Sequence, residues 1–161
     1  MKIYYLIIFL LVFSEPTMAQ PENTNLDFVV VIDNIIPPTL ARTKIQLIYT
    51  TDSFKVFEVY YHPGMLSFKK NDYEMLLSDT VKSVNLCFSH YRMVKNNQIE
   101  YNYQIELKIY WLKSLYNVIN IYNLDTKLYR KKYEPLDKNR NYTFELLSPD
   151  YTFKRVRKVD K

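Results

Sequence analysis

Side chains suited to acid–base or metal chemistry are few in this chain. The only histidines are His62 and His90, and Cys87 is the only cysteine. A zinc site uses three or four ligands, often in local pairs such as CxxC, and no such spacing occurs. Cys87 and His90 lie on one alternating segment at an odd separation, so their side chains point to opposite faces and cannot form a nucleophile–base pair. The sequence therefore predicts no metal ligands and no catalytic residues.

Carboxylate pairs and phosphate loops make no stronger case for catalysis. Glu100 and Glu106 share one face of a predicted strand, and a rise of about 3.3 Å per residue separates them by about 20 Å, too far for a glycosidase pair. The single glycine excludes glycine-rich phosphate loops. The enzymatic alternative is a small exported hydrolase in which the fold brings a carboxylate to His62 or His90. We expect a non-enzymatic protein without a cofactor.

Positive charge is concentrated near the C-terminal end. The chain has a net charge of +5, and the basic excess follows residue 126. The candidate anion-binding residues are Lys127, Arg130, Lys131, Lys132, Lys154, Arg155, Arg157 and Lys158. Such a surface favours a polyanion, either an acidic glycan, lipid phosphates or an acidic protein. The alternative is that these side chains are solvated on edge strands, where Lys and Arg block unwanted strand pairing.

Aromatic residues suggest one further contact. Trp111, with Tyr110 and Tyr116 nearby, follows the longest predicted strand, where an exposed ring could stack on a sugar or anchor a protein partner. The alternative is that Trp111 covers the end of the hydrophobic core, because large aromatic side chains are mostly buried.

The N-terminal segment has the pattern of an export signal. Lys2 precedes an unbroken apolar run over residues 3–13, and Thr17 and Ala19 place small residues where signal peptidase reads them. The run is shorter than the roughly 20 residues of a spanning helix, although an uncleaved anchor is the alternative. We predict that residues 1–19 are a signal peptide and that residues 20–161 form a single exported domain, periplasmic, secreted or cell-surface.

The rest of the chain is patterned as β-structure. Sixteen Tyr and nine Phe suit a pleated surface that is buried on one side. Strands are expected at residues 26–32, 44–50, 54–61, 83–93, 98–109, 115–122, 127–133, 142–147 and 151–157. Residues 98–109 alternate strictly, which no helix can accommodate. Residues 26–32 are apolar on both sides, which indicates a central strand.

Short polar segments mark the turns and one helix. The order His62-Pro63-Gly64-Met65 suits a type II turn, whose third residue needs a positive φ. A helix is expected over residues 72–78, because Glu74 follows Asn71 at capping-box spacing. The predicted fold is an all-β, mainly antiparallel, sandwich-like domain of about eight or nine strands with one short helix.

These patterns favour an exported binding domain of the cell envelope or surface. We expect a protein or acidic glycan partner and no nucleic acid, which an exported domain rarely meets. The alternative is a structural or assembly subunit that uses β-strand addition. A lone cysteine forms no internal disulfide, and Cys87 is expected to be either a small buried side chain or a link to another chain.

Overall fold

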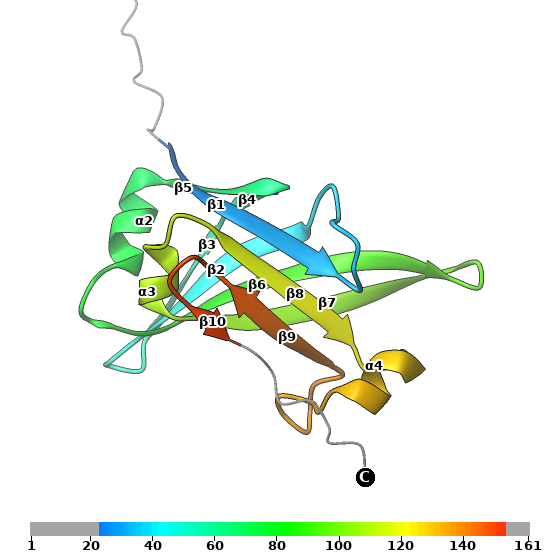
Figure 1. Ribbon diagram of the computed structural model, residues 1–161. Coiled ribbons are helices and arrows are strands. Elements are labelled where there is room, and N and C mark those ends of the chain that lie inside the picture. The colour runs from blue at the N-terminus through cyan, green and yellow to red at the C-terminus, as the bar shows by residue number, and fades with distance from the viewer. Residues whose placement is uncertain (1–22, 154–161) are drawn as a thin grey trace, which may run out of the picture.

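The computed structural model describes residues 23–153 and contains two β-sheets (Figure 1). The six-stranded sheet has the order β10-β9-β8-β1-β5-β4, and the four-stranded sheet has the order β3-β2-β6-β7. The predicted signal peptide lies outside the described residues, as do Lys154, Arg155, Arg157 and Lys158. The expectation of a mostly β, antiparallel-rich protein is confirmed, with ten strands in the described part instead of eight or nine.

The strands of the six-stranded sheet are β1 (Asn23–Ile32), β4 (Tyr60–His62), β5 (Gly64–Lys69), β8 (Asn117–Asn123), β9 (Tyr142–Leu147) and β10 (Thr152–Phe153). Those of the four-stranded sheet are β2 (Ala41–Tyr49), β3 (Phe54–Glu58), β6 (Val81–Val94) and β7 (Asn97–Leu107). Residues 23–153 contain three short helices instead of the one expected: α2 (Lys70–Leu76), α3 (Ile109–Leu112) and α4 (Lys127–Lys132). No helix within residues 23–153 has the length and apolar character needed to cross a membrane.

One hydrophobic core lies between the two sheets. Val30 and Ile119 from the six-stranded sheet, and Leu47, Leu86 and Ile105 from the four-stranded sheet, are all fully buried. On β7 the inward residues alternate with solvent-facing polar ones, as the sequence predicts. On β6 the alternate positions are more covered, and Asn85 and Ser89 are buried. Burying both inner faces in this sandwich-like arrangement is the main stabilising contribution.

Strand β1 is central, and this prediction is confirmed. It pairs antiparallel with β5 and parallel with β8, where Val30 is opposite Ile119. The pairing with β8 is the parallel exception in a sheet that is otherwise antiparallel.

The prediction of a single strand over residues 54–61 is wrong. The structure divides it into β3, in the four-stranded sheet, and β4, in the six-stranded sheet. Between them the buried Val59 donates its backbone N–H to the Thr43 carbonyl at 3.2 Å. The chain changes sheets at Val59, and alternation alone does not reveal this because the pattern continues on both sides.

The prediction of a strand over residues 127–133 is also wrong, because this segment contains α4. Tyr129 lies in α4, and Tyr133 is the C-cap whose backbone N–H donates to the Tyr129 carbonyl at 2.8 Å. Both are buried, and the Tyr133 ring stacks on Tyr122 of β8 with centroids 4.6 Å apart. Packing of this tyrosine pair explains the helix, and Leu128 is left 65% exposed.

The local signals around α2 and β4 are partly confirmed. Gly64 has a φ of +92°, the positive value expected in the Pro63-Gly64 turn between β4 and β5. The predicted helix is present as α2, but it begins at Lys70. Its N-cap is Lys69, without a side-chain hydrogen bond, so the expected capping box does not form.

Asp33 joins the two sheets at one end of the sandwich. It lies in a tight turn after β1, in which both Asp33 and Asn34 have positive φ. Its carboxylate accepts hydrogen bonds from the backbone N–H and side-chain amide of Asn123 in β8, at 2.9 and 2.8 Å. Arg92 of β6 donates to the same carboxylate at 3.0 Å. Asp33 is therefore a polar link between β8 and β6.

Candidate functional site

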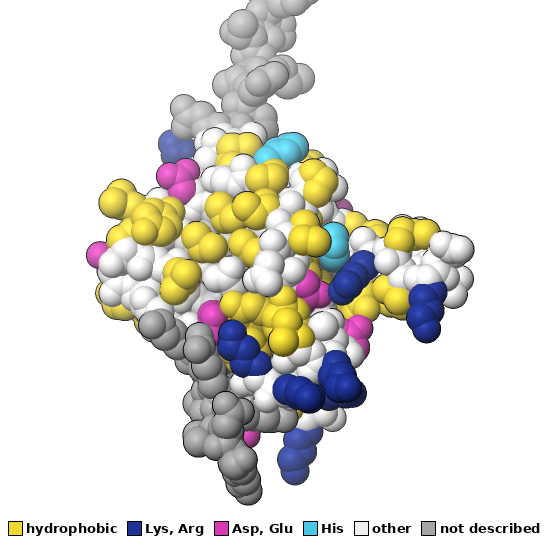
Figure 2. Space-filling model, turned by 45° about the vertical axis from the view of Figure 1, so that its right-hand side comes forward, with side chains coloured by type: hydrophobic (Ala, Val, Ile, Leu, Met, Phe, Trp, Pro, Cys, Tyr) yellow, Lys and Arg dark blue, Asp and Glu magenta, His cyan; other side chains and the backbone are white. Residues whose placement is uncertain are grey.

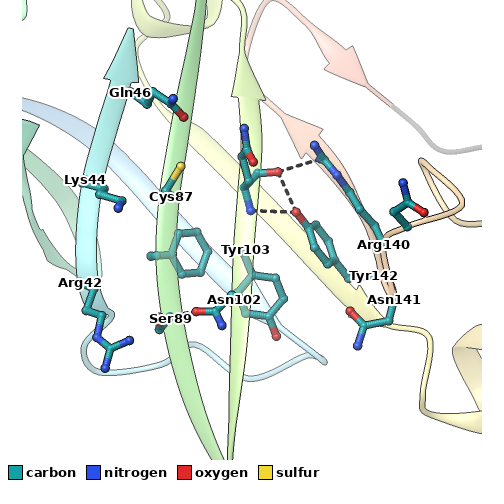
Figure 3. Close-up of a pocket in the computed structure, with 13 residues that line it drawn as sticks. Arg42, Lys44, Gln46, Cys87, Ser89, Asn102, Tyr103, Arg140, Asn141 and Tyr142 are labelled. Carbon is teal, nitrogen blue, oxygen red and sulfur yellow. Dashed lines mark hydrogen bonds between the residues drawn. The ribbon is translucent and has the colours of Figure 1, made fainter. Parts of the chain in front are cut away.

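The outer face of the four-stranded sheet carries a continuous polar surface. Lys44 of β2, Cys87 of β6 and Gln104 of β7 are neighbours in register and form one row across the sheet. They point outward because their sequence neighbours, such as Ile45, Leu86 and Ile105, are buried in the core. Figure 3 shows Arg42, Lys44 and Gln46 along β2, Cys87 on the next strand, and Arg140, Asn141 and Tyr142 on the far side of β7.

This surface is hollowed into a groove of about 540 Å³, which we call the basic groove. Its cations are Arg42, Lys44 and Arg140, and the described residues that line it include no Asp or Glu. The other polar side chains are mainly amides and hydroxyls, from Gln46, Ser89, Asn102, Gln104, Asn139 and Asn141. The groove therefore combines positive charge with many neutral hydrogen-bonding groups.

One wall of the groove is held by Tyr142 against the free edge of β7. The Tyr142 hydroxyl donates to the Gln104 carbonyl at 2.7 Å and accepts from the Gln104 backbone N–H at 2.8 Å. Arg140 donates to the same carbonyl at 2.9 Å (Figure 3). These bonds satisfy backbone groups that β7 cannot pair within its own sheet, and they fix the loop that carries Arg140.

The three cations differ in how far they are neutralised. Arg42 forms an ion pair with Glu100 at 2.9 Å. Arg140 donates to a neutral carbonyl, and its guanidinium lies 5.9 Å from the centroid of the Tyr142 ring. The Lys44 side chain has no ion pair or hydrogen bond within residues 23–153. Lys44 and Arg140 are thus the cations available to an anion.

Cys87 lies in the groove, and the expectation of a small buried side chain is met only in part. Its side chain is half-buried, because Leu86 and Phe88 on either side take the core-facing positions of β6. Burial raises the pKa of the Cys87 thiol, while the positive charges of Lys44 and Arg140 act in the opposite direction. Cys87 therefore places a single thiol inside the groove.

Four of the anion-binding residues predicted from sequence lie on α4 and outside the basic groove. Lys127, Arg130, Lys131 and Lys132 are exposed there. Figure 2 shows Lys and Arg side chains gathered on the lower half of the face where α4 lies. These α4 side chains form a cationic surface that is separate from the amide-rich lining of the groove.

Trp111, the predicted aromatic contact, is part of the core. Its side chain is 5% exposed, and its ring packs near Phe153, with centroids 6.1 Å apart. Its carbonyl accepts a hydrogen bond from the buried Asn117 side chain at 2.8 Å. Trp111 therefore covers one end of the sandwich, and its buried ring is not available to stack on a ligand.

The two histidines lie on different strands in different sheets. His62 is exposed in β4, whereas His90 is half-buried in β6, opposite Tyr101 of β7. Within the described part of the chain, no three His, Cys, Asp or Glu side chains cluster as metal ligands.

A pH-dependent contribution of His90 to stability is expected. Burial lowers the pKa of His90 most, the positive charge of Arg92 lowers it further, and Asp33 acts in the opposite direction. A folded-state pKa below the unfolded value of about 6.5 means that the unfolded chain binds the proton more readily. Stability should therefore be complete above pH 6.5 and fall as the pH drops toward the folded-state pKa.

Urea unfolding from pH 8 to pH 5 measures this effect. His90→Gln should show a shallower loss of stability than the unsubstituted protein, because the titrating group is gone. His62→Gln is the control, because it removes the other histidine, which is exposed in β4. Equal slopes for all three proteins would contradict a role for His90.

The cations of the basic groove were not singled out from sequence. Alternation over residues 44–50 already placed Lys44 and Gln46 opposite the apolar positions, and residues 98–109 did the same for Asn102 and Gln104. The alternation identifies the solvent-facing side chains of each segment, but it does not show that the two segments lie on the same face of one sheet. Arg140 lies in a loop without periodicity, so no local pattern indicates its direction.

Comparison with known proteins yields no match: no protein-family model, no curated protein and no solved structure is significantly similar to this chain. The geometry and chemistry of the basic groove are therefore the basis for a functional proposal.

Proposed function

We propose that this protein is an exported, non-enzymatic binding domain of the cell envelope or surface that holds an acidic glycan in the basic groove. Export is supported by the signal pattern of residues 1–19. The observation that carries the binding proposal is the pair of cations, Lys44 and Arg140, that flank Cys87 in a concavity without lining carboxylates.

The groove chemistry matches a carbohydrate better than an apolar small molecule. Small-molecule pockets are lined predominantly by hydrophobic side chains. Here amides from Gln46, Asn102 and Gln104 supply donors and acceptors that suit sugar hydroxyls, and the cations suit a carboxylate or sulfate. A neutral glycan would leave the cations without partners.

Protection of Cys87 tests the proposal directly. Cys87 is the only cysteine in the chain, so a thiol reagent labels no other residue. Its reaction can be followed by absorbance. An acidic oligosaccharide should slow the reaction several-fold at low salt. Protection should decrease as the ionic strength rises, since salt screens charges over about 8 Å at 0.15 M.

The matched control moves the thiol out of the groove. In the variant Cys87→Ser with Ser53→Cys, the thiol lies in the exposed β2–β3 turn and should not be protected. A neutral oligosaccharide should not protect Cys87 either. Failure of acidic oligosaccharides to protect Cys87 at low salt would contradict the proposal.

A second candidate is assembly through the edge of β7. The β6–β7 hairpin projects beyond β2, whose pairing with β6 ends at Ser89 (Figure 1). Gln104 is held by Tyr142, while β6 is the one neighbour that β7 has among the strands of residues 23–153. A partner strand could add along this edge. Partner retention that resists high salt would favour this candidate over the glycan.

A further inference from the structure

A second hollow, of about 520 Å³, lies on the other side of β2 from most of the basic groove. It is lined by Tyr60 and His62 of β4, by Glu58 at the end of β3, and by Thr39 and Thr43. We call it the tyrosine hollow. Arg42 and Lys44 line both concavities, so the two adjoin along β2.

The tyrosine hollow differs in chemistry from the basic groove. Glu58 is the direct cross-strand neighbour of Lys44, and its carboxylate disfavours an acidic group on this side. Tyr60 is 68% exposed, so its ring face is open to a ligand. An aromatic face with nearby hydroxyls and a carboxylate acceptor suits an uncharged sugar unit, which stacks on the ring and donates its hydroxyls.

The change of sheets at Val59 creates this arrangement. It places Glu58 in the four-stranded sheet and Tyr60 in the six-stranded sheet, on either side of a buried residue. The basic groove extends from β7 to β2, two strand spacings or about 10 Å. Adding the tyrosine hollow gives a track longer than one sugar ring, with an anionic part and a neutral part.

We propose that the ligand is a heteropolymeric glycan in which an acidic unit adjoins a neutral unit. The acidic unit binds Lys44 and Arg140 in the basic groove, and the neutral unit stacks on Tyr60 in the tyrosine hollow. This inference rests on the proposed function. It adds the requirement that acidic and neutral sugar units alternate, which simple binding of a polyanion would not impose.

Two oligosaccharide series of matched length test the requirement. One is a hyaluronan series, alternating glucuronate with N-acetylglucosamine, and the other is an oligogalacturonate series in which every unit is acidic. Calorimetric titration at low salt should give about tenfold tighter binding of the alternating series, the gain expected from one stacking contact and one avoided repulsion. The gain should appear only when the oligosaccharide is long enough to reach both concavities.

Variants assign the preference to the tyrosine hollow. Tyr60→Ala should remove the preference for the alternating series, so that the two series bind with similar affinity. Phe54→Ala is the control, because Phe54 is a 70% exposed aromatic residue of β3 that does not line the hollow. Glu58→Gln should strengthen oligogalacturonate binding.

The outcomes separate the two proposals. If both series bind equally and Tyr60→Ala changes neither, the alternating-glycan inference is wrong and the basic groove remains an acidic-glycan site. If neither series binds, the inference and the proposed function both fail. A preference lost in Tyr60→Ala and kept in Phe54→Ala supports the inference.

Discussion

Replacing Asp33 with alanine is expected to lower the free energy of unfolding by about 3 kcal/mol. The Asn123 backbone N–H and side-chain amide both donate to the Asp33 carboxylate, and Asn123 is 1% exposed. Without Asp33 these donors lose their acceptor in a buried site, at a cost of about 1–3 kcal/mol each. Loss of the Arg92 ion pair adds less, because the Arg92 side chain is 46% exposed.

Asp52→Ala provides a closely matched control. Asp52 is also an aspartate with positive φ in a turn, and it pairs with Lys82 at 3.0 Å. Both of these side chains are more than half exposed, so the loss should stay below about 1 kcal/mol. Denaturant unfolding of both variants measures the difference. Equal losses would mean that the positive-φ aspartate, rather than the buried network, determines the effect.

Reversing the two available cations of the groove is expected to reduce acidic-glycan binding on the order of 100-fold. In Lys44→Glu with Arg140→Glu, two attractive interactions become repulsive at the centre of the ligand site. Losing a desolvated charge contact typically costs 2–5 kcal/mol, and about 2.8 kcal/mol corresponds to 100-fold. Titration at low salt, with a thermal melt to verify folding, measures the effect.

The control for this double variant is Lys127→Glu with Lys131→Glu on α4. Both double substitutions change the net charge equally, so any general attraction of a basic protein for a polyanion is matched. The groove variant should lose binding, while the α4 variant should lose at most a few-fold. The reverse result would assign the site to the cationic surface of α4, as the sequence alone suggests.

Strand alternation identified most of the sheet interior correctly. Residues 98–109 were expected to bury Tyr101, Tyr103, Ile105 and Leu107, and all four are buried. The same pattern placed Ile99 in the core, yet it is 38% exposed because this part of the hairpin projects beyond β2. Alternation specifies which side chains share a face, but not whether another layer covers that face.

Two errors have one physical origin, which is that tertiary packing overrides a local pattern. The segment around Tyr129 became a helix because two tyrosines four residues apart pack beside Tyr122. The segment around Val59 was divided between sheets because β3 pairs with β2 while β4 pairs with β5. Neither set of partners is encoded within the segment itself.

The sequence by itself determined the high strand content, the central position of β1, and the outward direction of Lys44 and Gln104. These follow from local stereochemistry, since successive side chains on a strand alternate between faces. Only the tertiary structure decided that these side chains share one groove with Cys87 and Arg140. Their adjacency depends on pairing between distant strands and on a loop held by Tyr142, and long-range contacts of this kind leave no periodic signal in the chain.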